Sequence, residues 1–149
     1  MPINSLKTPK KMTESTKINF RYRKVRDIDD VTDLVVILFP GNRNQQHAAA
    51  RILLVLKNAN DLLKSFRDIE EKFGISRRTI ERTRAKLSRL GLIEHVSWMN
   101  RRYDGRQGWK LSGRMSTSLR CFADRIDSWR NDNSPDRKEK DNVLIAVLQ

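Results

Sequence analysis

Residues 66–90, FRDIEEKFGISRRTIERTRAKLSRL, predict two short helices joined by a tight turn. In the first helix, three apolar side chains share one face at helical spacing: Phe66, Ile69 and Phe73. Ser65 is expected to cap the start of this helix, and Gly74 to end it, because glycine adopts a positive φ at no steric cost. Ile75 then fills the turn as a buried side chain, and Ser76 is a favourable N-cap for the second helix.

The second helix, residues 77–90, is expected to have an apolar inner stripe and a basic outer face. Ile80, Leu87 and Leu90 fall on the inner stripe, with Thr83 between them. Six basic residues oppose the single acid Glu81 in this helix: Arg77, Arg78, Arg82, Arg84, Lys86 and Arg89. A helix that is merely solvated usually interleaves charges of both signs more evenly, so this bias indicates an anionic partner.

A β-hairpin is predicted directly after the second helix. Residues 92–98 are rich in strand-forming side chains, and residues 107–111 can return as the second strand. Between them, the dipeptide Asp104-Gly105 is a strong short-range hairpin signal. The predicted tip carries basic and aromatic side chains: Arg101, Arg102, Tyr103 and Arg106.

This order of elements resembles the helix-turn-helix and wing of winged-helix DNA-binding proteins, the group that includes the MarR-like and ArsR-like regulators. Five positions fit the pattern of that group: Ile69, Phe73, Gly74, Ile75 and Ile80. Two depart from it, because Glu70 stands where the group prefers a small residue and Thr83 where it prefers an apolar one. The resemblance covers roughly residues 44–129 and implies a winged helix-turn-helix. The expected fold class is therefore mainly α with a small β-hairpin wing.

The N-terminal part of the chain adds a tail and an extra helix to this domain. Residues 1–16 are predicted to be a disordered basic tail. Residues 17–43 are expected to form an N-terminal extension, made of a short strand or extended arm and then a helix. The winged helix-turn-helix domain is expected over residues 44–112, beginning with a helix. Leu62 and Leu63 can supply a short strand that pairs with the wing.

The C-terminal part is expected to contain a long helix over residues 113–131. Its apolar residues are spaced four, three, four and three: Met115, Leu119, Phe122, Ile126 and Trp129. This a/d-like seam indicates a dimerisation helix, although it can also pack on its own domain. Residues 132–149 read as a polar linker followed by a short apolar tail, which can dock on a partner subunit or on the N-terminal helix.

Composition limits the classes of partner and compartment. The 149 residues carry a formal net charge of +13 and are 38% hydrophobic, which suits one small core and a polyanionic partner. No apolar run approaches the roughly 20 residues of a membrane-spanning helix, so nucleic acid is favoured over a membrane. The chain shows no secretory signal and has a single cysteine, Cys121, so we expect a cytoplasmic protein.

The resemblance implies that the second helix enters the major groove of double-stranded DNA. Its first turns would read base edges through Arg77, Arg78, Thr79 and Arg82, and Ser76 would hold a phosphate. Arg84 and Lys86 are expected to contact phosphates or to act as solubilising charges. Glu81 can accept a hydrogen bond from cytosine or pair with a neighbouring arginine. Residues 99–107 of the wing, including Arg101, Arg102, Tyr103 and Arg106, would contact the backbone or the minor groove.

The sequence offers no constellation typical of an enzyme. His47 and His95 have no cysteine or acidic residue at metal-ligand spacing, so neither a metal nor another cofactor is expected. Cys121 has no nearby histidine to activate it. The three tryptophans are expected to be core or interface anchors: Trp98, Trp109 and Trp129.

The function expected from these features is a homodimeric, sequence-specific transcriptional regulator that binds double-stranded DNA. One alternative is a DNA-binding accessory protein of replication or of a mobile element, which would use the same contact residues. A second is a winged helix used for protein–protein interaction, and a third is RNA binding. The sequence identifies no small-molecule effector.

Overall fold

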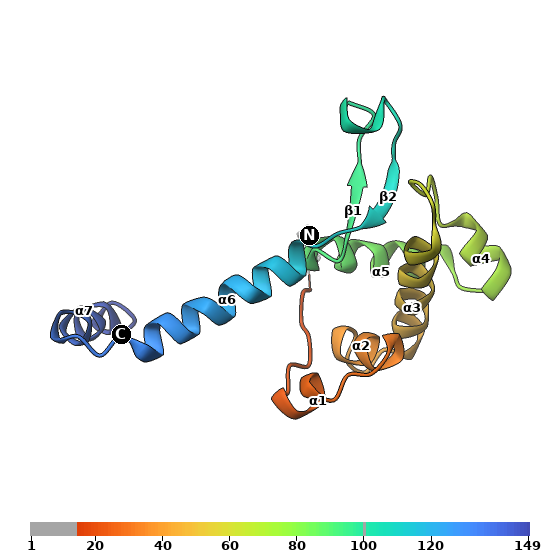
Figure 1. Cartoon of the computed structure of the whole chain (residues 1–149). Helices are drawn as coiled ribbons and strands as arrows, with labels where there is room; N and C mark the ends of the chain where they lie inside the picture. Colours follow the sequence, from red (N-terminus) through yellow and green to blue (C-terminus); the bar gives the residue numbers. More distant parts are fainter. Residues whose placement is uncertain (1–14, 100) are drawn as a thin grey trace, which may run out of the picture. The chain divides into compact units, whose positions relative to one another are not determined.

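The computed structural model describes residues 15–99 and 101–149 (Figure 1), so most of the predicted tail over residues 1–16 lies outside the described residues. The predicted fold class is confirmed, because the chain is mainly helical with one small antiparallel hairpin. The chain divides into two compact units, Met1–Ser112 and Gly113–Gln149. Within the described ranges, no helix is both long enough and apolar enough to cross a bilayer.

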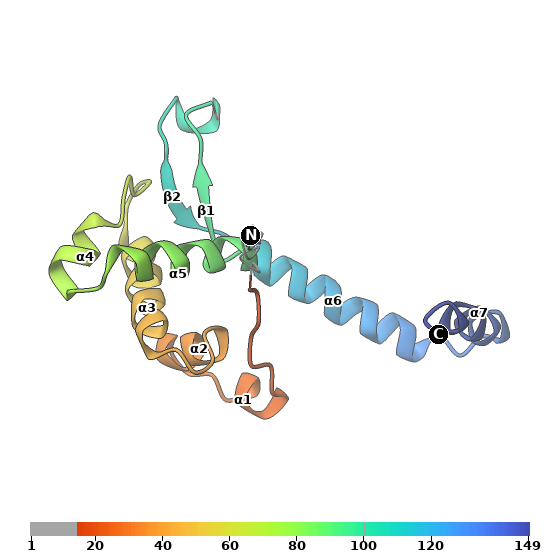
Figure 2. The ribbon, with the colours of Figure 1, turned by 180° about the vertical axis from the view of Figure 1, so that it is seen from behind.

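The first unit contains five α-helices and the hairpin. The helices are α1 (Tyr22–Arg26), α2 (Val31–Leu38), α3 (Arg43–Asn58), α4 (Arg67–Phe73) and α5 (Arg77–Leu90). The hairpin, which we call the wing, consists of β1 (Ile93–Val96), a connection with the 3-10 turn η1 (Arg101–Tyr103), and β2 (Gly108–Leu111). In both views the wing stands away from the helices of this unit (Figures 1 and 2).

Helix α3 forms the centre of the first unit, because it packs against both α2 and α5 and also contacts β2. Its residues Ala48 and Ala49 are completely buried, and their small side chains leave room for the neighbouring helices. Large side chains from every side of α3 fill the core: Leu38, Phe39, Ile52, Leu87 and Ile93. This core holds the start of the wing against α5.

The turn between α4 and α5 has the geometry expected from the sequence. Gly74 ends α4 with a φ of 63°, and Gly91 ends α5 with a φ of 84°. The Ser76 side chain accepts a hydrogen bond from the backbone amide of Thr79, which confirms it as the N-cap of α5. The prediction that Ser65 caps α4 is wrong, because Phe66 is the N-cap and makes no side-chain capping bond. Phe66 is instead buried in the core.

The predicted strand or arm near the N-terminus is found only in part. Residues 15–21 have no regular structure, and Tyr22–Arg26 then form α1 in place of a strand. The amide of Val25 bonds to the carbonyl of Arg21 at 2.9 Å, which closes a helical turn. The amide of Asn19 bonds to the carbonyl of Ile37 at 2.9 Å, so the extended segment is tied to α2.

The wing pairs with a third segment, as expected from Leu62 and Leu63. β1 and β2 are antiparallel, with Ile93 opposite Leu111 and Val96 opposite Gly108. Leu63 forms an isolated antiparallel bridge with Trp109, with N–O distances of 2.8 and 3.0 Å. This bridge joins the wing to the loop between α3 and α4.

The second unit consists of α6 (Arg114–Asn131) and α7 (Pro135–Ala146). The prediction of a polar linker after residue 131 is wrong over most of its length, because α7 occupies it. Ser134 caps α7 by accepting from the amide of Arg137, and Pro135 occupies its first turn. These two signals are local and outweigh the high polarity of the segment.

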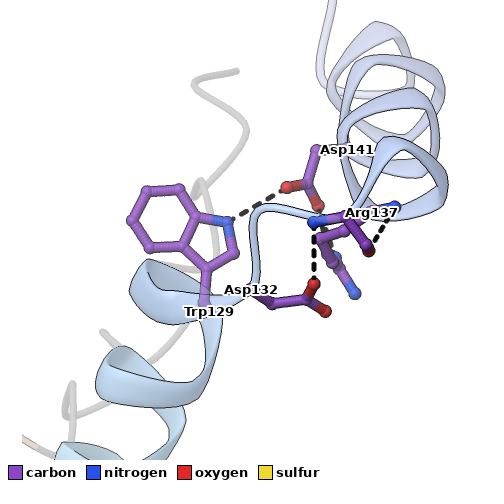
Figure 3. Close-up of polar contacts among 5 residues, drawn as sticks. Trp129, Asp132, Arg137 and Asp141 are labelled. Atoms are coloured by element: carbon purple, nitrogen blue, oxygen red, sulfur yellow. Dashed lines mark hydrogen bonds and ion pairs between the residues drawn. The ribbon is translucent and has the colours of Figure 1, made fainter.

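A polar cluster joins the two helices of the second unit (Figure 3). The indole N–H of Trp129 on α6 donates to Asp141 Oδ2 on α7 at 3.2 Å. Arg137 Nε donates to Asp141 Oδ1 at 2.9 Å, and this arginine is the main cause that lowers the pKa of the Asp141 carboxyl. No residue of either helix is buried, so polar contacts rather than a core connect them.

Candidate nucleic-acid interface

The outer face of α5 carries a line of arginines opposite its buried face. Four residues, which we call the outer stripe, recur at i, i+4, i+7 and i+11: Arg78, Arg82, Ala85 and Arg89. The three arginines are exposed, whereas Ile80, Thr83 and Leu87 on the opposite face are buried. The core therefore orients α5 so that the outer stripe faces solvent.

Two of the predicted contact residues on α5 are engaged with each other. Arg77 Nε lies 3.1 Å from Glu81 Oε1, one helical turn away, with the two side chains 80% and 49% exposed. Such an exposed i,i+4 pair contributes little to stability, but it occupies the Glu81 carboxylate. Glu81 was expected either to accept a hydrogen bond from cytosine or to pair with a neighbouring arginine, and in the structure it pairs with Arg77.

Two further arginines of α5 contact other parts of the unit. The guanidinium of Arg84 lies over the Trp109 ring, 5.1 Å from its centroid, at the base of the wing. Arg89 donates to the carbonyl of Ser15 at 3.4 Å. Both contacts leave these side chains less available to DNA than those earlier in the helix.

Arg78 and Arg82 differ from the other cations of α5. Across residues 15–99 and 101–149, neither guanidinium contacts a carboxylate, a carbonyl or an aromatic ring. Both side chains are exposed and lie one turn apart near the start of the helix. Their charge and their hydrogen-bond donors are therefore available for an external anion or base.

The position of Lys86 argues against its predicted phosphate contact. The residue is 8% exposed, and its ammonium donates to the carbonyl of Lys17 at 2.5 Å. It also lies 4.7 Å from the centroid of the Phe39 ring. Burial lowers the pKa of this ammonium, and the nearby charge of Arg89 adds to the effect. Lys86 therefore holds the N-terminal segment on α5, and its ammonium is not exposed to an external phosphate.

Ser76 and Thr79 form the N-terminal end of the interface. The Ser76 hydroxyl accepts from the amide of Thr79 at 3.2 Å and lies 2.9 Å from the Thr79 hydroxyl. Thr79 is half-buried. The Ser76 cap therefore satisfies the Thr79 amide, and the two hydroxyls are engaged with each other.

The basic residues of the wing fall into two groups. Arg101 and Arg102 lie exposed in η1. Arg106 follows η1 and contacts other parts of the unit, because it donates to Asp61 Oδ2 at 2.5 Å and to the carbonyl of Tyr103 at 3.1 Å. The pKa of Asp61 is lowered chiefly by the Leu62 amide and further by the charge of Arg106.

Tyr103 belongs to a second clasp inside the wing. Its phenol oxygen accepts from Lys110 Nζ at 2.7 Å, and the same ammonium lies 3.1 Å from Glu94 Oε1. These two contacts raise the pKa of Lys110, with the phenol contact the larger cause. The half-buried Tyr103 therefore braces the wing, and its phenol is already engaged.

Of the three tryptophans expected to be core or interface anchors, Trp98 is not part of the core of its own unit, so for this residue only the interface role stays a prediction. Trp98 is 65% exposed and the adjacent Met99 is 72% exposed, both in the wing. Trp109 does pack inward, with its ring 5.7 Å from Phe66 and 4.9 Å from His95. Alternation after the buried Val96 would turn Trp98 inward, but β1 ends at Val96.

The predicted dimer seam lies on α6 with its apolar side chains uncovered within its own unit. The exposed fractions are 43% for Leu119, 64% for Phe122, 45% for Ile126 and 61% for Trp129, and Met115 is half-buried. The Trp129 N–H is already bonded to Asp141, so only its ring faces are available for packing.

Other chemistry has little support in the described part of the chain. Residues 15–99 and 101–149 contain no group of three histidine, cysteine or acidic side chains placed to bind a metal ion. Cys121 is exposed on α6. Exposed arginines lie on the outer stripe of α5 and in η1 of the wing. Comparison of the chain with protein-family models, with curated proteins and with solved structures found no match.

Proposed function

We propose that this protein is a homodimeric, sequence-specific transcriptional regulator that binds double-stranded DNA. The observation that carries the proposal is the outer stripe, where Arg78 and Arg82 are exposed on one helix face and pair with no carboxylate of residues 15–99 and 101–149. An α-helix of this kind fits the major groove, and a net charge of +13 favours a polyanion. The resemblance of roughly residues 44–129 to winged-helix regulators supports the same assignment.

In this proposal α5 reads bases while other groups position the duplex. The guanidinium of an arginine can bond to O6 and N7 of guanine together, and such a pair discriminates against a wrong base by about 1–3 kcal/mol. Arg78 and Arg82 would make these contacts. The N-terminus of α5 at Ser76 would hold a phosphate, and Arg101 and Arg102 of the wing would contact the backbone or the minor groove.

Dimerisation would align two copies of α5 with a pseudo-palindromic site. The uncovered seam of α6, from Met115 to Trp129, supplies apolar surface for a second copy. Two-fold symmetric helix-turn-helix proteins place their recognition helices about one turn of DNA apart, roughly 34 Å. The proposed compartment is the cytoplasm, where the exposed Cys121 would remain reduced.

The proposal is tested by selecting bound sequences from random duplexes and then measuring affinity. Arg78→Ala and Arg82→Ala are each expected to weaken binding to the selected site by about 5- to 150-fold, the equivalent of 1–3 kcal/mol. The matched control is Arg26→Ala, which removes one exposed arginine of α1 that pairs with Asp27 at 3.1 Å. It changes the net charge equally and should leave the site affinity close to that of the wild type.

Salt dependence separates DNA binding from protein interaction. The logarithm of the binding constant should fall linearly with the logarithm of salt concentration, with a slope of about −0.9 per neutralised phosphate. If no sequence is enriched, or if both arginine variants bind the selected site as the wild type does, the assignment is refuted. The spacing of half-sites would also report the dimer geometry.

A further inference from the structure

The tip of the wing presents two large apolar side chains to solvent. Trp98 and Met99 are 65% and 72% exposed, among the more exposed large hydrophobic residues of the described chain. They follow the end of β1 and precede η1, so they lie in the connection rather than on a packed strand. Two adjacent exposed apolar side chains make this tip a candidate for a binding surface.

The structure below these side chains is well braced. Lys110 links Tyr103 and Glu94 across the two strands, and Arg106 ties the wing to Asp61. The carbonyl of Trp98 approaches Gly105, lying 3.9 Å from the position that a Cβ at residue 105 would occupy. These contacts tie β1, β2 and the loop at Asp61 together next to Trp98 and Met99.

The charges around the apolar pair identify the chemistry of its partner. Arg101 and Arg102 follow it after Asn100, and Asp104 is the only acidic residue in the sequence of residues 97–107. A site with an apolar centre and a cationic rim complements a ligand with apolar faces and an anionic rim. Stacked bases between phosphates have this arrangement.

We propose that the wing inserts Trp98 and Met99 between adjacent base pairs from the minor groove, unstacking one step and bending the duplex. This inference rests on the proposed function and adds a second mode of recognition to it. Proteins that insert apolar side chains in this way bend DNA by about 20–90°. Because pyrimidine–purine steps unstack most easily, the wing would favour such a step without hydrogen-bonding to its bases.

The experiment uses the full-length protein and its selected duplex, with 2-aminopurine placed in turn at each position beside the recognition site. Unstacking raises the fluorescence of this base, and donor and acceptor dyes at the two ends report bending. The test variant is Trp98→Ala with Met99→Ala, and Trp98→Phe keeps an apolar ring. The matched control is Phe20→Ala, which removes a 62% exposed aromatic side chain that precedes α1.

At saturating protein, the wild type, Trp98→Phe and Phe20→Ala should each give a several-fold rise in fluorescence at one step and a shortened end-to-end distance. The double variant should lose both signals while it still occupies the site. Unchanged signals in the double variant would overturn the wedge while leaving the proposed function intact, provided that Arg78→Ala still weakens binding. A wild type that binds no duplex would overturn both.

One alternative occupant is tested with the same proteins. Vesicles of phosphatidylcholine and phosphatidylserine in equal amounts offer an anionic rim and an apolar interior. The proposal would be overturned if the Trp98→Ala, Met99→Ala variant lost binding to these vesicles but kept the rise in 2-aminopurine fluorescence. The wing tip would then be assigned to a lipid surface.

Discussion

Replacing Thr83 by valine is expected to stabilise the first unit. Thr83 is completely buried in α5, and its hydroxyl has no hydrogen-bond partner among the described residues. Valine has nearly the same shape and a similar helix propensity, so the substitution removes the hydroxyl and little else. A buried polar group without a partner costs about 1–3 kcal/mol. We expect Thr83→Val to recover about 1 kcal/mol of this cost.

Thr79 provides a matched control one turn earlier in the same helix. Its hydroxyl lies 2.9 Å from the Ser76 hydroxyl, so Thr79→Val deletes a hydrogen bond that exists. A typical bond of this kind contributes about 0.5–1.5 kcal/mol. The same chemical change is therefore expected to raise the free energy of unfolding at residue 83 and to lower it at residue 79.

Urea denaturation monitored by tryptophan fluorescence gives both values. Trp109 packs against Phe66 in the core and reports the first unit. A shift of the midpoint at constant slope measures the change in stability, and 1 kcal/mol corresponds to a shift in melting temperature of about 4–8 °C for a unit of this size. If Thr83→Val is destabilising, the hydroxyl has a partner in solution, and the argument from its burial is refuted.

Three further variants, two single and one double, test other contacts. Lys86→Met should raise the melting temperature at pH 7, because burial lowers the pKa of this ammonium from its ordinary 10.5. The unfolded chain then binds the proton more tightly than the folded chain, so the stability of the wild type should rise as the pH increases toward 10.5. Melting curves recorded at several pH values should show this rise for the wild type and not for the variant. Gly108→Ala should cost about 1–3 kcal/mol in chemical denaturation, since its φ is 152° and a Cβ there would lie 2.8 Å from the carbonyl oxygen of Leu63. Leu119→Glu with Ile126→Glu should give a folded monomer by light scattering, because both side chains are uncovered on the seam of α6 and charged groups there would oppose pairing.

Each of these three predictions has a control in the same chain. Lys24→Met replaces an exposed lysine and should leave melting unchanged, while Gly113→Ala adds a Cβ that meets nothing within 4 Å. Thr117→Glu with Ser128→Glu places the same charges on the opposite face of α6 and should preserve the dimer. A dimer that persists in the seam variant would move the contact surface elsewhere, with α2 as the next candidate.

The sequence determined the helices and turns whose signals lie within a few residues. Gly74 sets the end of α4, and Ser76 and Gly91 set the limits of α5, because a cap or a positive φ acts on its own turn. The start of α7 also has local signals in the sequence, because Ser134 caps it and Pro135 lies in its first turn. The polarity of residues 132–141 led to the prediction of a linker there, and these capping signals outweigh it. Helical periodicity likewise separated the outer stripe from the buried face.

Only the tertiary structure decided which basic side chains remain available. The Lys86 ammonium is occupied by a carbonyl 69 residues away in the sequence, and the Arg106 guanidinium by a carboxylate 45 residues away. No local sequence pattern contains these partners. Trp98 is exposed because β1 ends at Val96, before alternation could turn its ring inward. Periodicity gives the direction of a side chain on its own element, whereas burial depends on what other segments place against it.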